Sequence, residues 1–375
     1  MKQSRSWILV ITAALVGVGL VAVFSTSAIM AERFGSPTRL LVRQAMWLGV
    51  GLAATSIFPP GAEAVRFNRK MYKVSKIRLA MGTFVSMTLI HPSRDQAEEA
   101  MGRAFEEVER LTCLMNRFDD GTAVGHLNRE GVLKDVPTEV VQVLSMALRH
   151  HRLTDGAFDI TVKPVVDLFK NKFSSGNPAP PSESELARAL SLVGAKYVEL
   201  RGRTVRFGKP GMGITLDGIA KGYIVDRASD VLAAHGVGNH LINAGGDIRT
   251  MGTKRGGRPW SVAIQDPRKK GHYPDVIRMT DGAIATSGNY EVYYDREKMF
   301  HHIVNPRTGL SPELSSSVSV LARRAVDADA LSTTVFVMNP VRGTRFIDSL
   351  PNCECFVIDR RGNRVKSRGW KSSAG

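Results

Sequence analysis

Two residues spaced four apart, Asp329 and Thr333, could bind a metal ion together. They lie in residues 328–333, which start a predicted helix, and side chains four residues apart share one helical face. A carboxylate and a hydroxyl are hard oxygen ligands, which suit Mg²⁺ better than zinc. A helix cap made by Asp327 or Asp329 accounts for the same residues without a metal. Taken alone, the segment favours the cap.

A glycine-rich segment, residues 216–223, could bind a phosphate group. It runs into a predicted helix that ends at Gly236, and a helix amino terminus offers unpaired N–H groups and the positive end of the helix dipole. Lys221 falls in the first turn, where the dipole disfavours a positive charge. A bound diphosphate would explain this lysine, but a lysine that simply faces solvent is equally compatible with the segment.

Four further segments are rich in Gly, Asp, Thr or His, and each of them also reads as a turn. The Gly-Gly turn among them would let a backbone approach a ligand closely. Its spacing excludes both the dinucleotide-binding G-x-G-x-x-G pattern and the Walker phosphate loop. The segments are residues 81–83 before a predicted strand, 156–161, the Gly-Gly turn at 243–247, and a predicted His-bearing strand that enters a Pro/Gly turn at 301–309.

The elements that must position these segments form one α+β unit from about Val65 onward. Helices and strands do not alternate regularly, which favours α+β over a doubly wound sheet. Helical periodicity predicts helices at 93–111 with Ser93 as cap, at 137–153 and at 183–193. Alternating or β-branched runs predict strands at 84–90, 197–200, 204–207, 260–264, 318–321 and 355–358.

The composition is that of a globular protein, with 375 residues of which 43% are hydrophobic and 23% charged. Lys and Arg exceed Asp and Glu by 51 to 35, which gives a formal charge of +16. The basic residues are spread without a nucleic-acid-binding signature, so we expect no nucleic-acid partner. Such a surface suits anionic lipid or phosphorylated ligands. Three cysteines exclude a disulfide framework and a structural zinc site.

The amino-terminal residues 1–58 are predicted to attach the chain to a membrane. Lys2 and Arg5 precede an apolar run at 7–30, long enough to cross the ~30 Å hydrocarbon core as a helix. A second apolar run at 45–58 is short for a span, and prolines stop it. If Lys2 and Arg5 lie in the cytoplasm, one span places the remaining chain outside the cytoplasm, whereas two spans place it back in the cytoplasm. We expect a linker at 59–78 and a membrane-associated protein with its catalytic part in the periplasm of a bacterium.

A cleavable leader is the alternative, because residues 62–64 have the small-x-small form of a cleavage site. Residues 19–54 also resemble the first membrane segment and following loop of the FtsW/RodA polytopic proteins. That likeness covers about a tenth of the chain, and such proteins have many more spans.

Eight collinear blocks resemble the ApbE family, the FAD:protein FMN transferases formerly described as thiamine-biosynthesis lipoproteins. Each block is weak alone, but eight in order are specific, and they cover residues 79–375. The resemblance implies an ApbE-like (T-fold-like) α+β fold of mixed sheets with packed helices. The blocks are MGTFVSMTL, FDDGTAVGHLN, GAFDITVKPVVDLF, LDGIAKGYIVDRASDVL, LINAGGDI, AIATSGNY, HHIVNPRTG and VDADALSTTVFVM.

The resemblance implies Mg²⁺-dependent transfer of FMN from FAD to a Ser or Thr hydroxyl of an acceptor flavoprotein, with release of AMP. The acceptor would belong to a membrane redox system. A metal would neutralise the diphosphate charge, and a base would help the hydroxyl to attack. Two alternatives stay open: a Mg²⁺-dependent FAD pyrophosphatase that gives FMN and AMP, and a non-enzymatic flavin-binding protein attached to the membrane. The Asp329–Thr333 pair argues against the second alternative.

The resemblance also implies roles for single residues, carried over by position. His302 would be the general base, in preference to His301, and Lys221 would contact the diphosphate. The metal ligands would be the Gly218 carbonyl, Asp329 and Thr333, with Ser332 nearby. The FAD-binding residues would be Met81, Phe118, Ala157, Phe158, Asp159, Thr215, Lys221 and Ile303.

Two positions depart from the family pattern. Phe118 stands where the family often has Tyr, which keeps the stacking surface but loses a hydroxyl. Thr215 occupies the usual acidic position, and Asp217 occupies a glycine position. Asp217 either supplies the displaced carboxylate or weakens the site, so an FAD contact at Thr215 is the least secure of the expected contacts.

Overall fold

Residues 63–66, 71–174, 178–268, 273–289 and 300–373 are described by the computed structural model. The chain divides into two units, Met1–Ala62 and Glu63–Gly375, and all described residues belong to the second. The expected membrane segment, residues 1–58, therefore lies outside the described residues. No helix within the described ranges is both long and apolar enough to cross a membrane.

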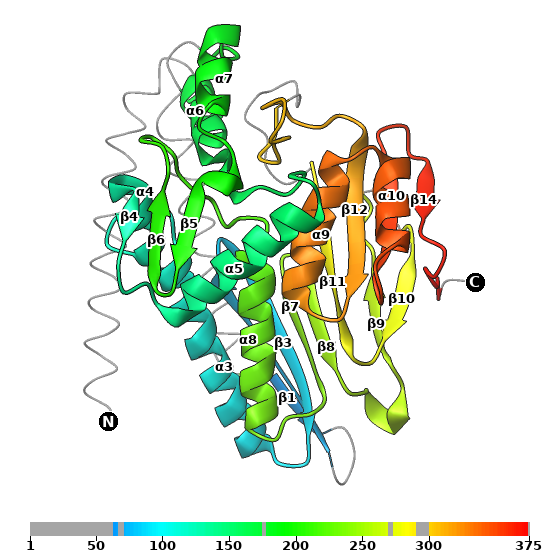
Figure 1. Ribbon diagram of the computed structural model, residues 1–375. Helices are drawn as coiled ribbons and strands as arrows, with labels where there is room; N and C mark the ends of the chain where they lie inside the picture. Colours follow the sequence, from blue (N-terminus) through cyan, green and yellow to red (C-terminus); the bar gives the residue numbers. More distant parts are fainter. Residues whose placement is uncertain (1–62, 67–70, 175–177, 269–272, 290–299, 374–375) are drawn as a thin grey trace, which may run out of the picture. The chain divides into compact units, whose positions relative to one another are not determined.

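An antiparallel sheet of nine strands organises the described part of the chain (Figure 1). Every neighbouring pair in it is antiparallel, which the α+β prediction requires. In spatial order the strands are β1 (Glu63–Arg66), β2 (Tyr72–Ala80), β3 (Thr83–His91), β7 (His240–Ala244), β8 (Asp247–Met251), β11 (Gly282–Gly288), β12 (Ser315–Ala322), β13 (Glu354–Asp359) and β14 (Arg364–Lys366).

Two smaller sheets accompany it among the described residues. One pairs β9 (Trp260–Ala263) with β10 (Val276–Met279). The other has the order β4 (Val132–Leu133), β6 (Thr204–Phe207) and β5 (Val198–Arg201).

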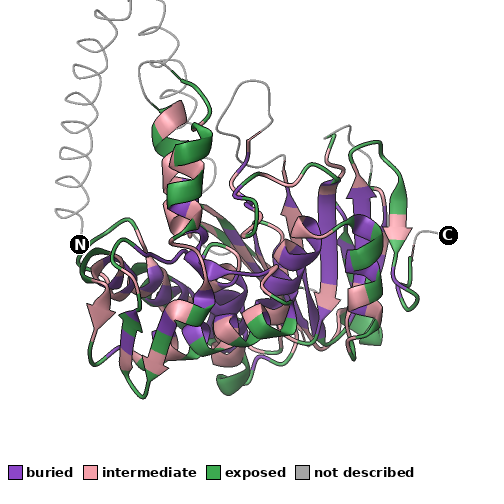
Figure 2. Cartoon of the chain, turned by 45° about the horizontal axis from the view of Figure 1, so that its top comes forward, coloured by how far each residue is buried: buried purple, intermediate pink, exposed green. Residues whose placement is uncertain are grey.

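Four helices cover one face of the large sheet: α3 (Arg94–Met115), α8 (Ala220–Ala234), α9 (Ala325–Val337) and α10 (Pro340–Asp348). Neighbouring helices in this layer pack on one another, so α8 lies between α3 and α9. The helices bury their inner sides, and the central strands are largely buried (Figure 2). The remaining helices are α4 (Ala123–Glu130), α5 (Thr138–Leu153), α6 (Lys163–Phe173) and α7 (Glu183–Leu190).

Helix α3 forms where the sequence predicts it. The Ser93 hydroxyl accepts a hydrogen bond from the Gln96 N–H at 3.3 Å, which caps the helix. Met101, Phe105 and Val108 recur at helical spacing and are fully buried against the sheet. The same local signals place α5 and β3 close to their predicted bounds.

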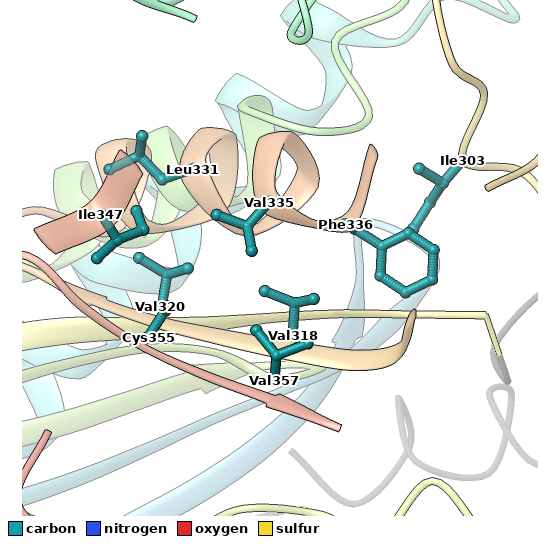
Figure 3. Packing of buried hydrophobic residues seen from close by; sticks show 9 residues of the cluster. All are labelled: Ile303, Val318, Val320, Leu331, Val335, Phe336, Ile347, Cys355 and Val357. Carbon is teal, nitrogen blue, oxygen red and sulfur yellow. The ribbon is translucent and has the colours of Figure 1, made fainter. Parts of the chain in front are cut away.

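Two hydrophobic clusters fill the opposite faces of the sheet. The first lies between α9, α10 and strands β12 and β13, and Figure 3 shows its side chains: Ile303, Val318, Val320, Leu331, Val335, Phe336, Ile347, Cys355 and Val357. The second lies between the other face and the β9–β10 pair: Val262, Ile264, Ile277, Met279, Ile284, Phe356, Ile358 and Trp370. The described part of the chain is therefore a sheet packed on both faces over its β8–β13 half.

Three expectations need correction. The expected linker at 59–78 contains strand β1 and most of β2, because residues of β2 pair along their whole length with β3. Helix α9 begins at Ala325 instead of residue 328, with Arg324 as its N-cap, so neither Asp327 nor Asp329 caps it. The expected strand at 301 is one bridge residue, His301, followed by a bend and irregular backbone.

Because His240, at the start of β7, is buried, we expect the stability of the fold to decrease in acid. Its ring accepts from the Ser229 hydroxyl at 2.7 Å and donates to the Val237 carbonyl at 2.9 Å, and burial lowers its pKa to about 4. Because the unfolded chain binds this proton more readily, stability falls as the pH drops from about 6.5 to about 4. We expect a loss of about 3 kcal/mol over that window, measured by urea unfolding.

The control for this prediction is exposed His235, whose ring contacts only the Val231 carbonyl among the bonds described. His240→Gln should flatten the acid limb of the stability profile, whereas His235→Gln should leave its slope unchanged. Equal slopes in both variants would contradict a role for His240.

Candidate active site

A partly buried lysine at the start of α8 is paired with a buried carboxylate. The Lys221 Nζ lies 2.5 Å from Oδ2 of Asp247, the first residue of β8. Burial works against the charge of Lys221, but Asp247 and Asp329 raise its pKa well above its usual range. Lys221 is therefore a positive charge held by an ion pair, although about a third of its side chain remains accessible to solvent or to a ligand.

Asp329, in the second turn of α9, is buried beside this pair. Its Oδ2 accepts a hydrogen bond from the Gly222 N–H at 3.0 Å, so α8 and α9 meet at this carboxylate. Burial and the nearby Asp247 raise the pKa of Asp329 to about 8, while Lys221 acts in the opposite direction. The negative charges of Asp247 and Asp217, which contribute to this raised pKa, would also favour a cation bound beside Asp329.

Gly222 is required where the two helices touch. A Cβ on this residue would lie 2.3 Å from the Ala325 carbonyl oxygen, far inside contact distance. The two helix starts thus approach with no side chain between them, which lets the Gly222 N–H reach Asp329.

Gly218, just before α8, brings three expected site residues together. A Cβ there would lie 3.0 Å from the Thr333 Oγ1 and 3.5 Å from the Phe158 ring. Ser287 of β11 adds a hydroxyl that lies 2.8 Å from Ser332 Oγ and 3.3 Å from Thr333 Oγ1. The site thus gathers hydroxyl oxygens from α9 and β11 next to the Gly218 backbone.

These donors fit Mg²⁺ and do not fit zinc. The carboxylate of Asp329, the hydroxyl of Thr333 and the carbonyl of Gly218 are hard oxygen donors, which Mg²⁺ prefers, usually with substrate phosphates completing its shell. Within the described residues, no group of three or more His, Cys, Asp or Glu side chains could hold a metal. A site with one protein carboxylate and open positions suits a metal shared with a phosphate ligand.

Asp217 supplies negative charge beside this cluster. Its carboxylate lies 3.5 Å from the Arg117 Nε and contributes to the raised pKa values of both Lys221 and Asp329. Thr215 is buried, and its N–H bonds the Ile160 carbonyl at 2.8 Å. Asp217 thus places a largely exposed carboxylate two residues along the chain from Thr215, where it faces Arg117.

Phe118 lies at the surface near the same charges. Its ring is exposed, with the Arg117 guanidinium 4.3 Å and the Lys170 ammonium 4.9 Å from its centroid. Arg117 also contacts Asp167 at 3.0 Å, which holds the guanidinium in place. An exposed aromatic ring flanked by two cations is a suitable surface for stacking a negatively charged aromatic ligand.

The side chains of Asp159 and Ile303 are buried in the protein interior. The Asp159 carboxylate accepts from the Thr161 N–H at 2.7 Å and the Ala195 N–H at 3.0 Å, and lies 3.2 Å from His151. It fixes the loop that holds Ala157 and Phe158. Ile303 is buried with Phe336 in the cluster of Figure 3.

His301 and His302 occupy different environments. The His301 ring is buried, lies 3.1 Å from the Pro312 carbonyl and packs edge-on against Phe336 of α9. His302 is only partly buried. The segment that carries His302 is therefore packed against α9, one turn beyond Thr333, which agrees with His302 as the more available base.

Met81 lies in a tight turn at the end of β2. Met81 and Gly82, with φ of 53° and 69°, form the two-residue turn between β2 and β3. A Cβ on Gly245 would lie 2.5 Å from the Thr83 hydroxyl, so the start of β3 packs on the Gly-Gly turn that precedes Asp247. Met81 is therefore two residues from a side chain that packs on that turn.

The structure places Gly218 beside Phe158 and Thr333, and the contact between α8 and α9 brings Lys221 near Asp329. Sequence reasoning assigned no role to Asp247, Ser287 or Arg117. The position of Asp247 directly after a Gly-Gly turn was its only signal, since β-turn glycines often bring a backbone close to a ligand.

Comparisons with known proteins point to one family. A sequence model described as the ApbE family matches residues 81–357. An FAD:protein FMN transferase of Vibrio cholerae is 34% identical over 211 residues, which are 56% of this chain and 63% of that relative. One of Haemophilus influenzae is 32% identical over 276 residues, 70% of this chain and 80% of the relative.

A solved structure supports the same assignment. The crystal structure of the ApbE protein from Thermotoga maritima matches with a TM-score of 0.72 and 31% identity, covering 79% of this chain and 97% of that one. The expected ApbE-like α+β fold is therefore confirmed. With a family match across most of its length and a matching fold, this chain belongs to the ApbE family.

Proposed function

We propose that this chain transfers the FMN half of FAD to a Ser or Thr hydroxyl of an acceptor protein and releases AMP. Membership of the ApbE family and relatives named FAD:protein FMN transferase support the proposal. The single observation that carries it is the partly buried Lys221 at the start of α8, paired with Asp247 and within the electrostatic influence of Asp329. A fixed cation at a helix amino terminus is suited to a diphosphate.

The cofactor of this proposal is Mg²⁺, with FAD as substrate. Asp329, Thr333 and the Gly218 carbonyl would hold the ion, since these donors match its preference for hard oxygen. Bound there, Mg²⁺ would neutralise charge on the diphosphate as AMP departs.

The chain's own residues carry the remaining steps of the proposal. Lys221 binds diphosphate oxygens, and the exposed ring of Phe118 offers a surface on which an FAD ring stacks. His302 accepts the proton of the acceptor hydroxyl. The hydroxyl oxygen forms a bond to the FMN phosphorus, the bond between that phosphorus and the bridging oxygen breaks, and AMP leaves with the bridging oxygen.

We also propose a location for this reaction. Residues 1–58 would attach the protein to a bacterial inner membrane, and the unit Glu63–Gly375 would lie on its extracytoplasmic side. The acceptor would then be a flavoprotein of a membrane redox system, with its Ser or Thr hydroxyl exposed on that side.

The test uses the full chain with FAD and Mg²⁺, with and without a Ser/Thr acceptor peptide. We expect a peptide mass gain equal to FMN minus water and matching AMP release, and a fall of about 100-fold in His302→Gln. The control is His235→Gln, which changes an exposed histidine at the far end of α8.

Two outcomes would contradict the proposal. AMP and FMN formed without any labelled peptide, for each acceptor tried, would make the protein an FAD pyrophosphatase. FAD that stays intact in the presence of Mg²⁺ would make it a flavin-binding protein.

A further inference from the structure

Large apolar side chains are exposed on the outer face of β1, β2 and β3. The exposed fractions are 65% for Ile77, 73% for Leu79, 70% for Phe84 and 58% for Val65. Leu79 and Phe84 are directly opposite in the register, and Ile77 lies two residues from Leu79, so the three share one face. Val65 pairs with Lys73, which alternation places on that same face.

This face is the uncovered continuation of a face that is otherwise buried. The register links Ile77 through Ser86, Asn243, Ile248 and Ile284 to Leu321. The last three pack in the cluster beneath the β9–β10 pair. The opposite face of β2 and β3 lies under α3, toward the viewer in Figure 1. Among the described strands of this sheet, only β1, β2 and β3 thus expose large apolar side chains to solvent.

The charged residues of these strands divide between the two faces. Alternation places Lys73 and Glu63, the one acidic residue of β1, β2 and β3, on the outer face. Arg66, Lys76 and Arg78 lie on the opposite face, where Arg78 contacts Glu109 of α3 at 3.0 Å. The outer face of these strands is therefore apolar and without net charge, which suits burial in the interface of a bilayer.

The chain itself connects this face to an apolar segment. The apolar run at 45–58 ends five residues before Glu63, the first residue of β1. Five residues span at most about 18 Å even when fully extended. If the run lies in a bilayer, β1 must therefore lie close to the bilayer surface.

We propose that the outer face of β1–β3, with Ile77, Leu79 and Phe84, docks on the surface of a lipid bilayer. This inference rests on the proposed membrane attachment through residues 1–58. The Met81–Gly82 turn lies between Leu79 and Phe84, and the start of β3 packs on the turn before Asp247. Docking therefore holds the candidate site at the membrane surface, where the hydroxyl of a membrane-bound acceptor is available.

The first experiment measures the surroundings of single residues in the full chain. The background is Cys113→Ser, because Cys113 is exposed, whereas burial raises the pKa values of Cys353 and Cys355 to about 11 and slows their labelling. An environment-sensitive fluorophore is attached at Phe84→Cys. The matched position is Val341→Cys, which is also exposed but lies on α10, over the other face of the sheet.

The chain is reconstituted in phosphatidylcholine vesicles with phosphatidylglycerol. We expect a blue-shifted emission that brominated lipid quenches at position 84, and neither effect at position 341. Equal emission at both positions would overturn the inference, and so would a shift at position 84 that requires an added acceptor protein. A chain that stays in the aqueous fraction would overturn both docking and anchoring while leaving the transferase proposal intact.

The second experiment links docking to activity. The double variant Ile77→Thr with Phe84→Thr places threonine, which is common in strands, at both positions and removes the apolar surface. We expect an unchanged rate with a soluble acceptor peptide and a fall of about tenfold with a membrane-embedded acceptor. A variant that matches the wild-type rate with both acceptors would contradict docking. A wild-type chain that labels neither acceptor would instead refute the transferase proposal.

Discussion

Asp329→Asn is expected to reduce FMN transfer by at least about 100-fold at a fixed Mg²⁺ concentration. The amide has the size of the carboxyl, and its oxygen can still accept from the Gly222 N–H, so the α8–α9 contact is retained. The substitution removes the charge that faces Lys221 and that would hold Mg²⁺. The measurement is the mass gain of an acceptor peptide and the release of AMP, repeated over a Mg²⁺ titration.

Asp327→Asn is the matched control, since Asp327 lies on the same helix two residues earlier and therefore on a different face. Its carboxylate contacts Arg149 at 2.8 Å and His150 at 2.9 Å, on a part of α9 that faces α5. We expect its transfer rate to stay within about threefold of the wild type, as for a surface-side ion pair. If Asp329→Asn were as active as Asp327→Asn at every Mg²⁺ concentration, the assignment of Asp329 as a metal ligand would be wrong.

The sequence predicts those parts of the fold and site that depend on local patterns. Helix α3 has its cap and its apolar face within one segment, so Ser93 and Phe105 could be interpreted correctly. Asp329 and Thr333 share a helical face because they are four residues apart. Lys221 could be placed at a helix start for the same reason.

The parts that could not be predicted depend on contacts between distant segments. Strand β2 has charged residues at three of its nine positions, among them Lys76 and Arg78, which obscured the alternation and led to a linker prediction. The pair of Lys221 with Asp247 joins residues 26 apart in the sequence. Ile303 was expected to contact the flavin, but nothing local shows that its side chain enters the core under α9.

The start of α9 illustrates the same limit. Its N-terminal N–H groups are capped by a residue of another helix: Asp226 of α8 accepts from the Ala325 and Val326 N–H groups, each at 3.0 Å. Local sequence therefore contains no cap for α9, and its first turn was missed. Asp226 thereby fixes the helix that carries Asp329.

Asp226→Ala is expected to destabilise the fold by about 3–5 kcal/mol, measured by urea unfolding. Asp226 is fully buried and lies 3.5 Å from Arg249 and 3.3 Å from Arg324. Burial raises the pKa of this carboxyl, while Arg324 and the two amides act against that shift. Removing it leaves two N–H groups without their acceptor and the largely buried Arg249 without its carboxylate partner, which explains the size of the effect.

Two variants separate this capping role from a general effect of removing charge. Asp230→Ala removes a half-exposed carboxylate from the same helix, one that bonds only the exposed side of Arg324 at 3.1 Å among the described contacts, and should cost under about 1 kcal/mol. Asp226→Asn keeps one acceptor oxygen for the α9 amides and should fall between the two, at about 2 kcal/mol. If Asp226→Ala were no more destabilising than Asp230→Ala, the contact between α8 and the start of α9 would not be what holds Asp329 in the site.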